Sequence, residues 1–299
     1  TRDPAPAEKD FLMVSHLDTS DPGEYFRWTK TGANPFQASV DGQLVYGLGT
    51  ADSKFDFIAK MIALAAAEKK AYKKIRPVLA GTFGAETGHG LMKLFRRKKF
   101  KPAAALVGRP TDMQLADRGP GYAALEISIP FDVEERRYRE NHDLLENSHS
   151  QSKVFTSVNK HGLAPDFYDN PIVKALEFVR QLPEGIAIIS LEGGSSPGTV
   201  PDITMLEMDI VANSAYGMTQ KLKALYDILQ RFAGAFRQVT SPGFVPEYST
   251  FNVGQIVSDS EEIKILGNCR LVPQVTQEIY DNWLQVLRRD CEALGARFH

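Results

Sequence analysis

Short apolar runs alternate with helix-patterned stretches in the first part of the chain. The runs have the length and composition of buried strands, and the stretches between them repeat apolar side chains at helical spacing. The predicted strands are 11–14, 77–83 and 103–107, and the predicted helices are 55–69 and 91–98. This order predicts an α/β domain with a parallel sheet, which we place at residues 1–118.

The pattern changes after residue 118. The first strand alternates apolar with polar positions, and strands and amphipathic helices no longer alternate one by one. The predicted elements are strands at 122–129, 186–191 and 203–211 and helices at 171–182 and 218–232. The polar stretch 134–152 is expected to be a solvated loop or helix surface. We therefore expect a separate α+β domain over residues 119–299.

This second domain contains a weak internal repeat. Residues 205–229 and 263–287 each read as a strand, a turn and a helix. The repeat predicts two similar halves at about 119–235 and 245–299. The alternative is that any strand-to-helix unit resembles any other.

Composition excludes several classes of function. The chain is 43% hydrophobic and 24% charged, which is typical of a globular protein. Lys and Arg total 35 against 37 for Asp and Glu, so no charge pattern favours nucleic acid or a membrane surface. Cys269 and Cys291 lack metal-site spacing and predict reduced thiols in a cytoplasmic protein. Because the chain starts at Thr1, we expect a preceding segment to be missing.

Polar side chains follow the predicted strands of the first domain. His16 and Asp18 come after the first strand, Asp52 lies on a glycine-punctuated loop before a helix, and Glu86 follows the second strand. Ligands gather at the carboxyl ends of parallel strands, so these residues predict one shared site. An imidazole that binds a metal usually donates its other N–H to a carboxylate, which Asp18 could supply. The alternative for each residue alone is a solvated loop side chain.

Taken together, several motifs in the first domain resemble those of a known family. HLDT at 16–19, NPF at 34–36, DGQLVYGLGTADSK at 41–54 and GAETGHG at 84–90 match its motifs in order and spacing. This is the zinc-dependent exopeptidase and deacylase family of acetylornithine deacetylase, succinyl-diaminopimelate desuccinylase and aminoacyl-histidine dipeptidase. The resemblance implies a zinc-exopeptidase-like domain with a parallel-rich sheet and an α+β lid domain. It also implies amide hydrolysis of small peptides or N-acyl amino acids.

The resemblance assigns metal and catalytic roles. It implies that His16 and Glu86 bind zinc, that Asp52 bridges two zinc ions, and that Asp18 is a catalytic residue beside His16. The sequence departs from the family at two of these motifs. Ala85 stands where the family has its general base, and Arg109 stands where it has a carboxylate ligand. A guanidinium cannot ligate zinc, and we expect it to pair with Asp52 or Glu86 instead.

These departures leave two hypotheses open. The first is a zinc-dependent dipeptidase or deacylase, and the second is a non-catalytic relative that binds a peptide or a partner protein. We expect one zinc ion or none, because the family's last ligand, a C-terminal histidine, also has no counterpart before the chain ends.

The lid motifs add three candidates. NSHSQS resembles the family element whose histidine reaches an active site, often that of a partner subunit, so it implies a catalytic His149 and a homodimer through the lid. STFNVGQI and NCRLVP imply substrate-binding roles for Asn252 and Arg270. The alternatives are an exposed loop histidine and a structural arginine at a strand end.

Overall fold

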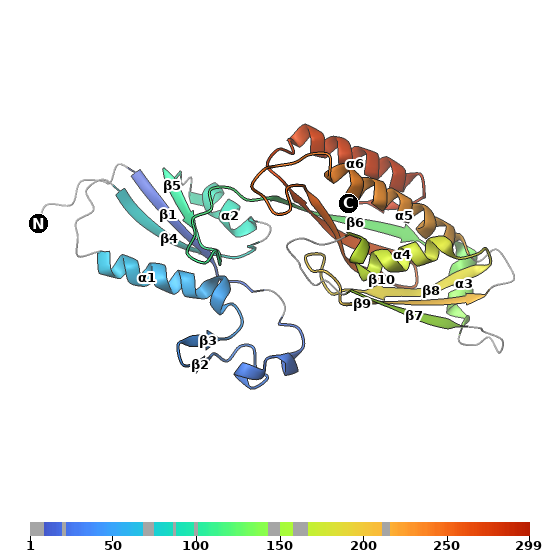
Figure 1. Ribbon diagram of the computed structural model, residues 1–299, viewed down its shortest axis with the longest axis horizontal. Helices are drawn as coiled ribbons and strands as arrows, with labels where there is room; N and C mark the ends of the chain where they lie inside the picture. The colour runs from blue at the N-terminus through green and yellow to red at the C-terminus, as the bar shows by residue number, and fades with distance from the viewer. Residues whose placement is uncertain are drawn as a thin grey trace, which may run out of the picture. The chain divides into compact units, whose positions relative to one another are not determined.

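The computed structural model describes residues 9–19, 22–67, 75–85, 88–98, 101–142, 150–157, 167–210 and 216–299. The chain divides into two compact units, Thr1–Asp117 and Arg118–His299 (Figure 1). Each unit is described by itself below.

The first unit is built on a parallel sheet. Its strand order is β4-β1-β5, and β1 pairs in parallel with both neighbours. The strands are β1 (Lys9–His16), β4 (Ile75–Thr82) and β5 (Ala104–Val107), and the helices are α1 (Phe55–Ala67) and α2 (His89–Lys98). A hairpin of β2 (Ser39–Asp41) and β3 (Leu44–Tyr46) precedes α1. The predicted strand–helix alternation and parallel pairing are confirmed.

Three short helical segments complete the first unit. They are η1 (Tyr25–Arg27), η2 (Thr29–Thr31) and η3 (Thr50–Lys54). η3 leads directly into α1 and carries Asp52, whose backbone angles are not helical. A kink between η3 and α1 therefore holds the candidate bridging carboxylate outside the regular helix.

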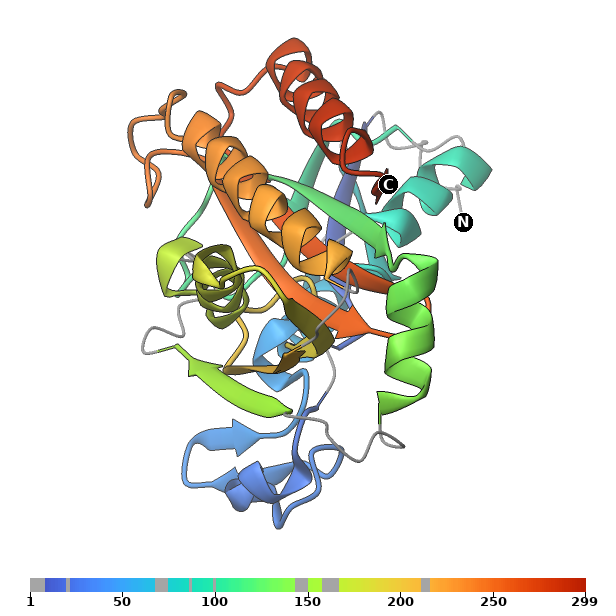
Figure 2. The same ribbon diagram turned by 90° about the vertical axis from the view of Figure 1, so that its right-hand side faces the viewer.

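The second unit is an antiparallel sheet covered by helices. The strand order is β12-β6-β11-β10-β8-β9-β7. The strands are β6 (Gly121–Pro130), β7 (Gln151–Thr156), β8 (Ile186–Gly193), β9 (Ile203–Ile210), β10 (Thr250–Ser258), β11 (Glu262–Leu271) and β12 (Arg297–Phe298). The helical segments are α3 (Val133–Glu140), η5 (Phe167–Asp169), α4 (Pro171–Gln181), α5 (Gly217–Phe236) and α6 (Gln277–Glu292). Figure 2 shows α4, α5 and α6 side by side along the sheet, and the apolar core lies between these helices and the strands.

Local sequence explains where the helices begin. Asn170 caps α4 by accepting hydrogen bonds from the backbone N–H groups of Ile172 and Val173, and Pro171 takes the first helical position. Both segments of the predicted repeat form a strand followed by a helix, β9–α5 and β11–α6. The proposed duplication of the two halves stays a prediction.

The polar stretch after β6 is more ordered than expected. Its first part is α3, which begins with a capping box formed by Asp132 and Glu135. Glu135 is 4% exposed and also accepts a hydrogen bond from the backbone N–H of Met218. The carboxylate therefore joins the starts of α3 and α5, so the expectation of a purely solvated surface is wrong for Glu135.

Both cysteines are free and buried in the core of the second unit. Burial raises the pKa of the Cys269 thiol, and burial followed by the nearby Asp290 carboxylate raises the pKa of Cys291 to about 12. The prediction of reduced thiols stays a prediction. Within the described ranges, none of the helices has both the length and the apolar character that crossing a bilayer requires.

Candidate active site in the first unit

His16 lies at the carboxyl end of β1, inside the strand. The parallel ladder continues two residues past the predicted run, with His16 opposite Thr82 of β4. Its side chain is 11% exposed. Its Nε2 lies 2.7 Å from Asp52 Oδ1, and its Nδ1 lies 3.0 Å from the carbonyl oxygen of Asp18. Both ring nitrogens face oxygen acceptors, so a cationic imidazolium can donate to both and a neutral ring to only one.

Each carboxylate oxygen of Asp52 has its own side-chain partner. Its Oδ1 faces His16, and its Oδ2 accepts a hydrogen bond from Arg109 Nη1 at 3.2 Å. The neighbouring Ser53 hydroxyl donates to the carbonyl oxygen of His16 at 2.8 Å, which fastens this loop to β1. The expected contact between Arg109 and Asp52 is therefore present. The side chains of Arg109 and Asp52 are 46% and 41% exposed, so water screens the pair.

Asp18 is fixed by the backbone of the turn after β4. Its Oδ2 accepts from the N–H groups of Gly84 at 3.0 Å and Ala85 at 3.3 Å. Partial desolvation acts to raise the pKa of Asp18, but the backbone hydrogen bonds from Ala85, Gly84 and Asp18 itself, together with His16, hold it below its usual value. Asp18 Oδ1 lies 3.5 Å from His16 Nδ1. The expected hydrogen bond from His16 to the Asp18 carboxylate is therefore not formed, because His16 Nδ1 bonds the backbone carbonyl of Asp18 instead. The catalytic role of Asp18 stays a prediction.

Lys60 is a buried residue next to the carboxyl end of β1 that the sequence analysis did not identify. Lys60 of α1 is 7% exposed, and its ammonium donates to the carbonyl oxygen of Val14 at 2.8 Å and to Asp56 Oδ2 at 2.6 Å. It also lies 3.2 Å from the Ser15 hydroxyl, which itself donates to Asp56. These contacts hold the last residues of β1 against α1. Asp56 and Lys60, four residues apart in an otherwise apolar helix, were the available signal.

The lid candidates belong to the second unit. Asn252 of β10 is 3% exposed. Its side-chain amide nitrogen donates to the backbone carbonyl oxygens of Thr199 at 2.8 Å and Pro197 at 3.4 Å. Its side-chain oxygen accepts a hydrogen bond from the side chain of Asn170. These partners favour a role in positioning the loop after β8 over the expected substrate contact. Arg270 of β11 is half-buried, opposite Thr250 of β10. Its substrate role remains a prediction.

Two predicted site residues lie outside the described residues. They are Glu86, expected as a zinc ligand, and His149, expected as a catalytic residue. The structure therefore brings together His16, Asp18 and Asp52 of the predicted site, with Arg109 beside them.

The described donor set does not fit a two-zinc centre. Zinc sites use about three or four protein ligands, each presenting a lone pair. His16 and Asp52 are hydrogen-bonded to each other, and the second oxygen of Asp52 is bound to Arg109, which has no lone pair to offer. Over the described ranges, no three His, Cys, Asp or Glu side chains are grouped so that they could hold a metal ion. The two-zinc chemistry implied by the resemblance therefore cannot be placed on these residues as they stand.

Comparison with known proteins identifies the family. The chain is 32% identical over 119 residues to an acetylornithine deacetylase from Buchnera aphidicola, covering 40% of this chain and 30% of that protein. It is 32% identical over 108 residues to a succinyl-diaminopimelate desuccinylase from Novosphingobium aromaticivorans, covering 35% of this chain and 27% of that protein. These alignments therefore span less than a third of each relative.

A solved structure shares the fold. Aminoacylhistidine dipeptidase from Vibrio alginolyticus superposes with a TM-score of 0.53 at 15% identity, over 99% of this chain and 67% of that one. The expected architecture of a zinc-exopeptidase-type α/β domain with an α+β lid is confirmed. The profile described as "Peptidase family M20/M25/M40" matches residues 12–265. With most of its length matched by that profile, this chain belongs to peptidase family M20/M25/M40.

Proposed function

We propose that this protein binds small peptides or N-acyl amino acids on a metallopeptidase scaffold and hydrolyses them slowly or not at all. The single observation that carries the proposal is the ion pair between Arg109 and Asp52, 3.2 Å from Nη1 to Oδ2. A fixed guanidinium charge neutralises the carboxylate that would otherwise bridge two metal ions, and its field opposes a divalent cation at the same place.

The position of Ala85 supports low activity. A general base contributes about 100- to 10,000-fold in rate, and a methyl group cannot transfer a proton. The backbone N–H of Ala85 hydrogen-bonds to Asp18, so this turn keeps its connection to β1 although the side chain has no proton-transfer group. The turn therefore positions Asp18 but provides no general base at position 85.

The substrate class rests on relatives. The names of the aligned proteins denote a deacetylase, a desuccinylase and a dipeptidase, so small amides with a carboxylate are the ligands we expect. Arg270 would bind that carboxylate, and His149 would act from a partner subunit in a homodimer formed through the lid. We also propose a cytoplasmic location and at most one weakly bound zinc ion.

The first test measures metal and turnover on the purified chain. Elemental analysis after exhaustive dialysis is expected to give at most one zinc ion per chain. Hydrolysis of aminoacyl-histidine dipeptides and N-acetyl amino acids is expected to stay far below the roughly 10 per second typical of enzymes. Two retained zinc ions together with a rate near that value would overturn the proposal.

The second test restores the missing groups. Arg109→Glu combined with Ala85→Glu removes the competing cation and adds two carboxylates, so zinc affinity should rise over the parent. Arg76→Glu is the matched control, because Arg76 is an exposed arginine of the same unit that pairs with Asp10 at 2.7 Å. Equal zinc uptake by the parent, the double variant and the control would contradict the role given to Arg109.

A second candidate function is a working metal-dependent amidohydrolase. The observation that favours it is the convergence of His16, Asp18 and Asp52 at the end of β1 in the arrangement that the resemblance implies. The zinc count and turnover of the first test separate the two candidates.

A further inference from the structure

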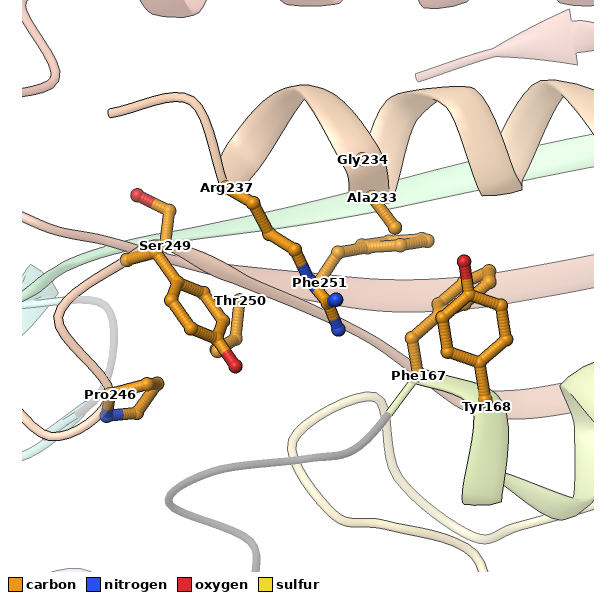
Figure 3. Close-up of a pocket in the computed structure, with 10 residues that line it drawn as sticks. Phe167, Tyr168, Ala233, Gly234, Arg237, Pro246, Ser249, Thr250 and Phe251 are labelled. Carbon is orange, nitrogen blue, oxygen red and sulfur yellow. The ribbon is translucent and has the colours of Figure 1, made fainter. Parts of the chain in front are cut away.

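A cavity lies at the carboxyl end of α5 in the second unit. Its volume is about 210 Å³, and it is formed by η5, the last turn of α5 and the start of β10. The rings of Phe167 and Phe251 form apolar walls, while Arg237 brings a charged group to it (Figure 3). Tyr248 and Thr250 also line it. The cavity therefore combines an apolar body with a polar edge.

Arg237 gives the polar edge its charge. Figure 3 shows its side chain extending from the end of α5 toward the cavity. It lies over the rings of Tyr168 and Tyr248. The guanidinium carbon lies 6.0 Å and 5.4 Å from these two ring centroids, within the range of cation–π attraction. Arg237 forms no hydrogen bond or ion pair with any carboxylate of the described residues. Its ring contacts position the cation and leave its N–H donors for a ligand.

Thr250 also lines the cavity and is 7% exposed. Its hydroxyl oxygen is buried in the wall without a hydrogen-bond partner, so a ligand in the cavity does not contact it. The nearby Ser249 hydroxyl accepts from the backbone N–H of Val272. Arg237 is therefore the charged group that the cavity offers to a ligand.

We propose that this cavity binds a small monocarboxylate with an apolar side chain. The guanidinium of Arg237 would hold the carboxylate, since charge-assisted hydrogen bonds to a carboxylate are among the strong ones. Phe167 and Phe251 would cover the apolar part. The volume is below the roughly 300 Å³ at which pockets for drug-sized ligands begin, so the ligand has about the size of one amino acid. The site involves neither His16 nor Asp52 and does not depend on the hydrolytic function.

The test uses isovalerate, its neutral isostere isovaleramide, and inorganic phosphate as probes of the full chain, with binding measured by saturation-transfer NMR and calorimetry. Isovalerate is expected to bind saturably, and isovaleramide at least about tenfold more weakly because it lacks the charge that pairs with Arg237. Phosphate is expected to bind more weakly than isovalerate because it has no apolar group to pack against the rings of Phe167 and Phe251.

Variants locate the binding. Arg237→Gln should weaken isovalerate binding by at least about tenfold. Arg288→Gln is the matched control, because Arg288 stacks over Phe298 at 5.5 Å outside the cavity, and it should bind as the parent does. His16→Ala should also bind normally, which separates this site from the one in the first unit.

Three results would overturn the proposal. They are the absence of saturable isovalerate binding at concentrations on the order of tens of millimolar, phosphate binding as tight as isovalerate binding, and loss of binding in His16→Ala but not in Arg237→Gln.

Discussion

Replacing Lys60 with methionine tests what holds the carboxyl end of β1 in place. Methionine keeps the unbranched chain that packs in the helix and removes the ammonium. The ammonium makes hydrogen bonds of 2.8 Å to Val14 and 2.6 Å to Asp56, and the lysine is 7% exposed. Val14 keeps a second partner, the backbone N–H of Gly108 at 2.8 Å, so its carbonyl stays satisfied. The main loss is therefore the charge that faces Asp56.

The size of the effect follows from the exposure of Asp56. Removing one partner of a fully buried ion pair costs about 3–5 kcal/mol. The Asp56 side chain is 33% exposed, so water compensates part of the loss. We expect Lys60→Met to lower the free energy of unfolding by about 1–3 kcal/mol. Adding Asp56→Asn should recover much of this, because the uncharged amide oxygen can still accept from Ser15.

Urea unfolding followed by tryptophan fluorescence measures these changes. The chain has two tryptophans, Trp28 in the first unit and Trp283 in the second, so a Trp283→Phe background makes the signal specific for the unit that contains Lys60. Lys30→Met is the control, because the Lys30–Asp41 pair is 58% and 66% exposed and its loss should change stability by less than about 1 kcal/mol. The reasoning is refuted if Lys60→Met unfolds at the same urea concentration as the parent, or if Asp56→Asn makes it worse.

Three further outcomes are expected. Arg109→Ala should cost at most about 1 kcal/mol in urea unfolding, because both partners of its ion pair are nearly half exposed; a loss above about 3 kcal/mol would mean that the pair is buried in solution. Gly108→Ala should lower the free energy of unfolding by about 1–3 kcal/mol, because the added Cβ would lie 1.7 Å from Asp56 Oδ2. A melting temperature equal to that of the parent would show that Asp56 does not lie this close to Gly108. Burial, followed by the hydrogen bond to Asp209, raises the pKa of Tyr138 from its usual value of 10.0 to about 12. Its contribution to stability is therefore complete below pH 10 and is lost as pH rises toward 12. Tyr138→Phe should therefore show a smaller loss of stability between pH 10 and 12 than the parent in parallel melts, and identical slopes would count against this assignment.

The sequence by itself determined the order of the elements and the place of the candidate site. Apolar runs of strand length separated by helix-patterned stretches predict a parallel sheet, because each strand must be buried on both faces. His16, Asp18 and Asp52 could be placed at one end of that sheet since parallel strands share a direction. The pairing of Arg109 with a carboxylate was predicted from the resemblance, which places a metal ligand at this position, together with the fixed positive charge of a guanidinium.

Only the tertiary structure decided which atoms meet. Periodicity assigns a residue to a face but not to a partner distant in sequence, so the hydrogen bonds from the turn after β4 to Asp18 and the exposure of the Arg109–Asp52 pair could not be read from the chain. Lys60 and Glu135 are charged residues that sequence patterns place on the surface, yet both are buried because neighbouring elements supply their hydrogen-bond partners. Burial of a charge depends on partners that only the folded chain brings together.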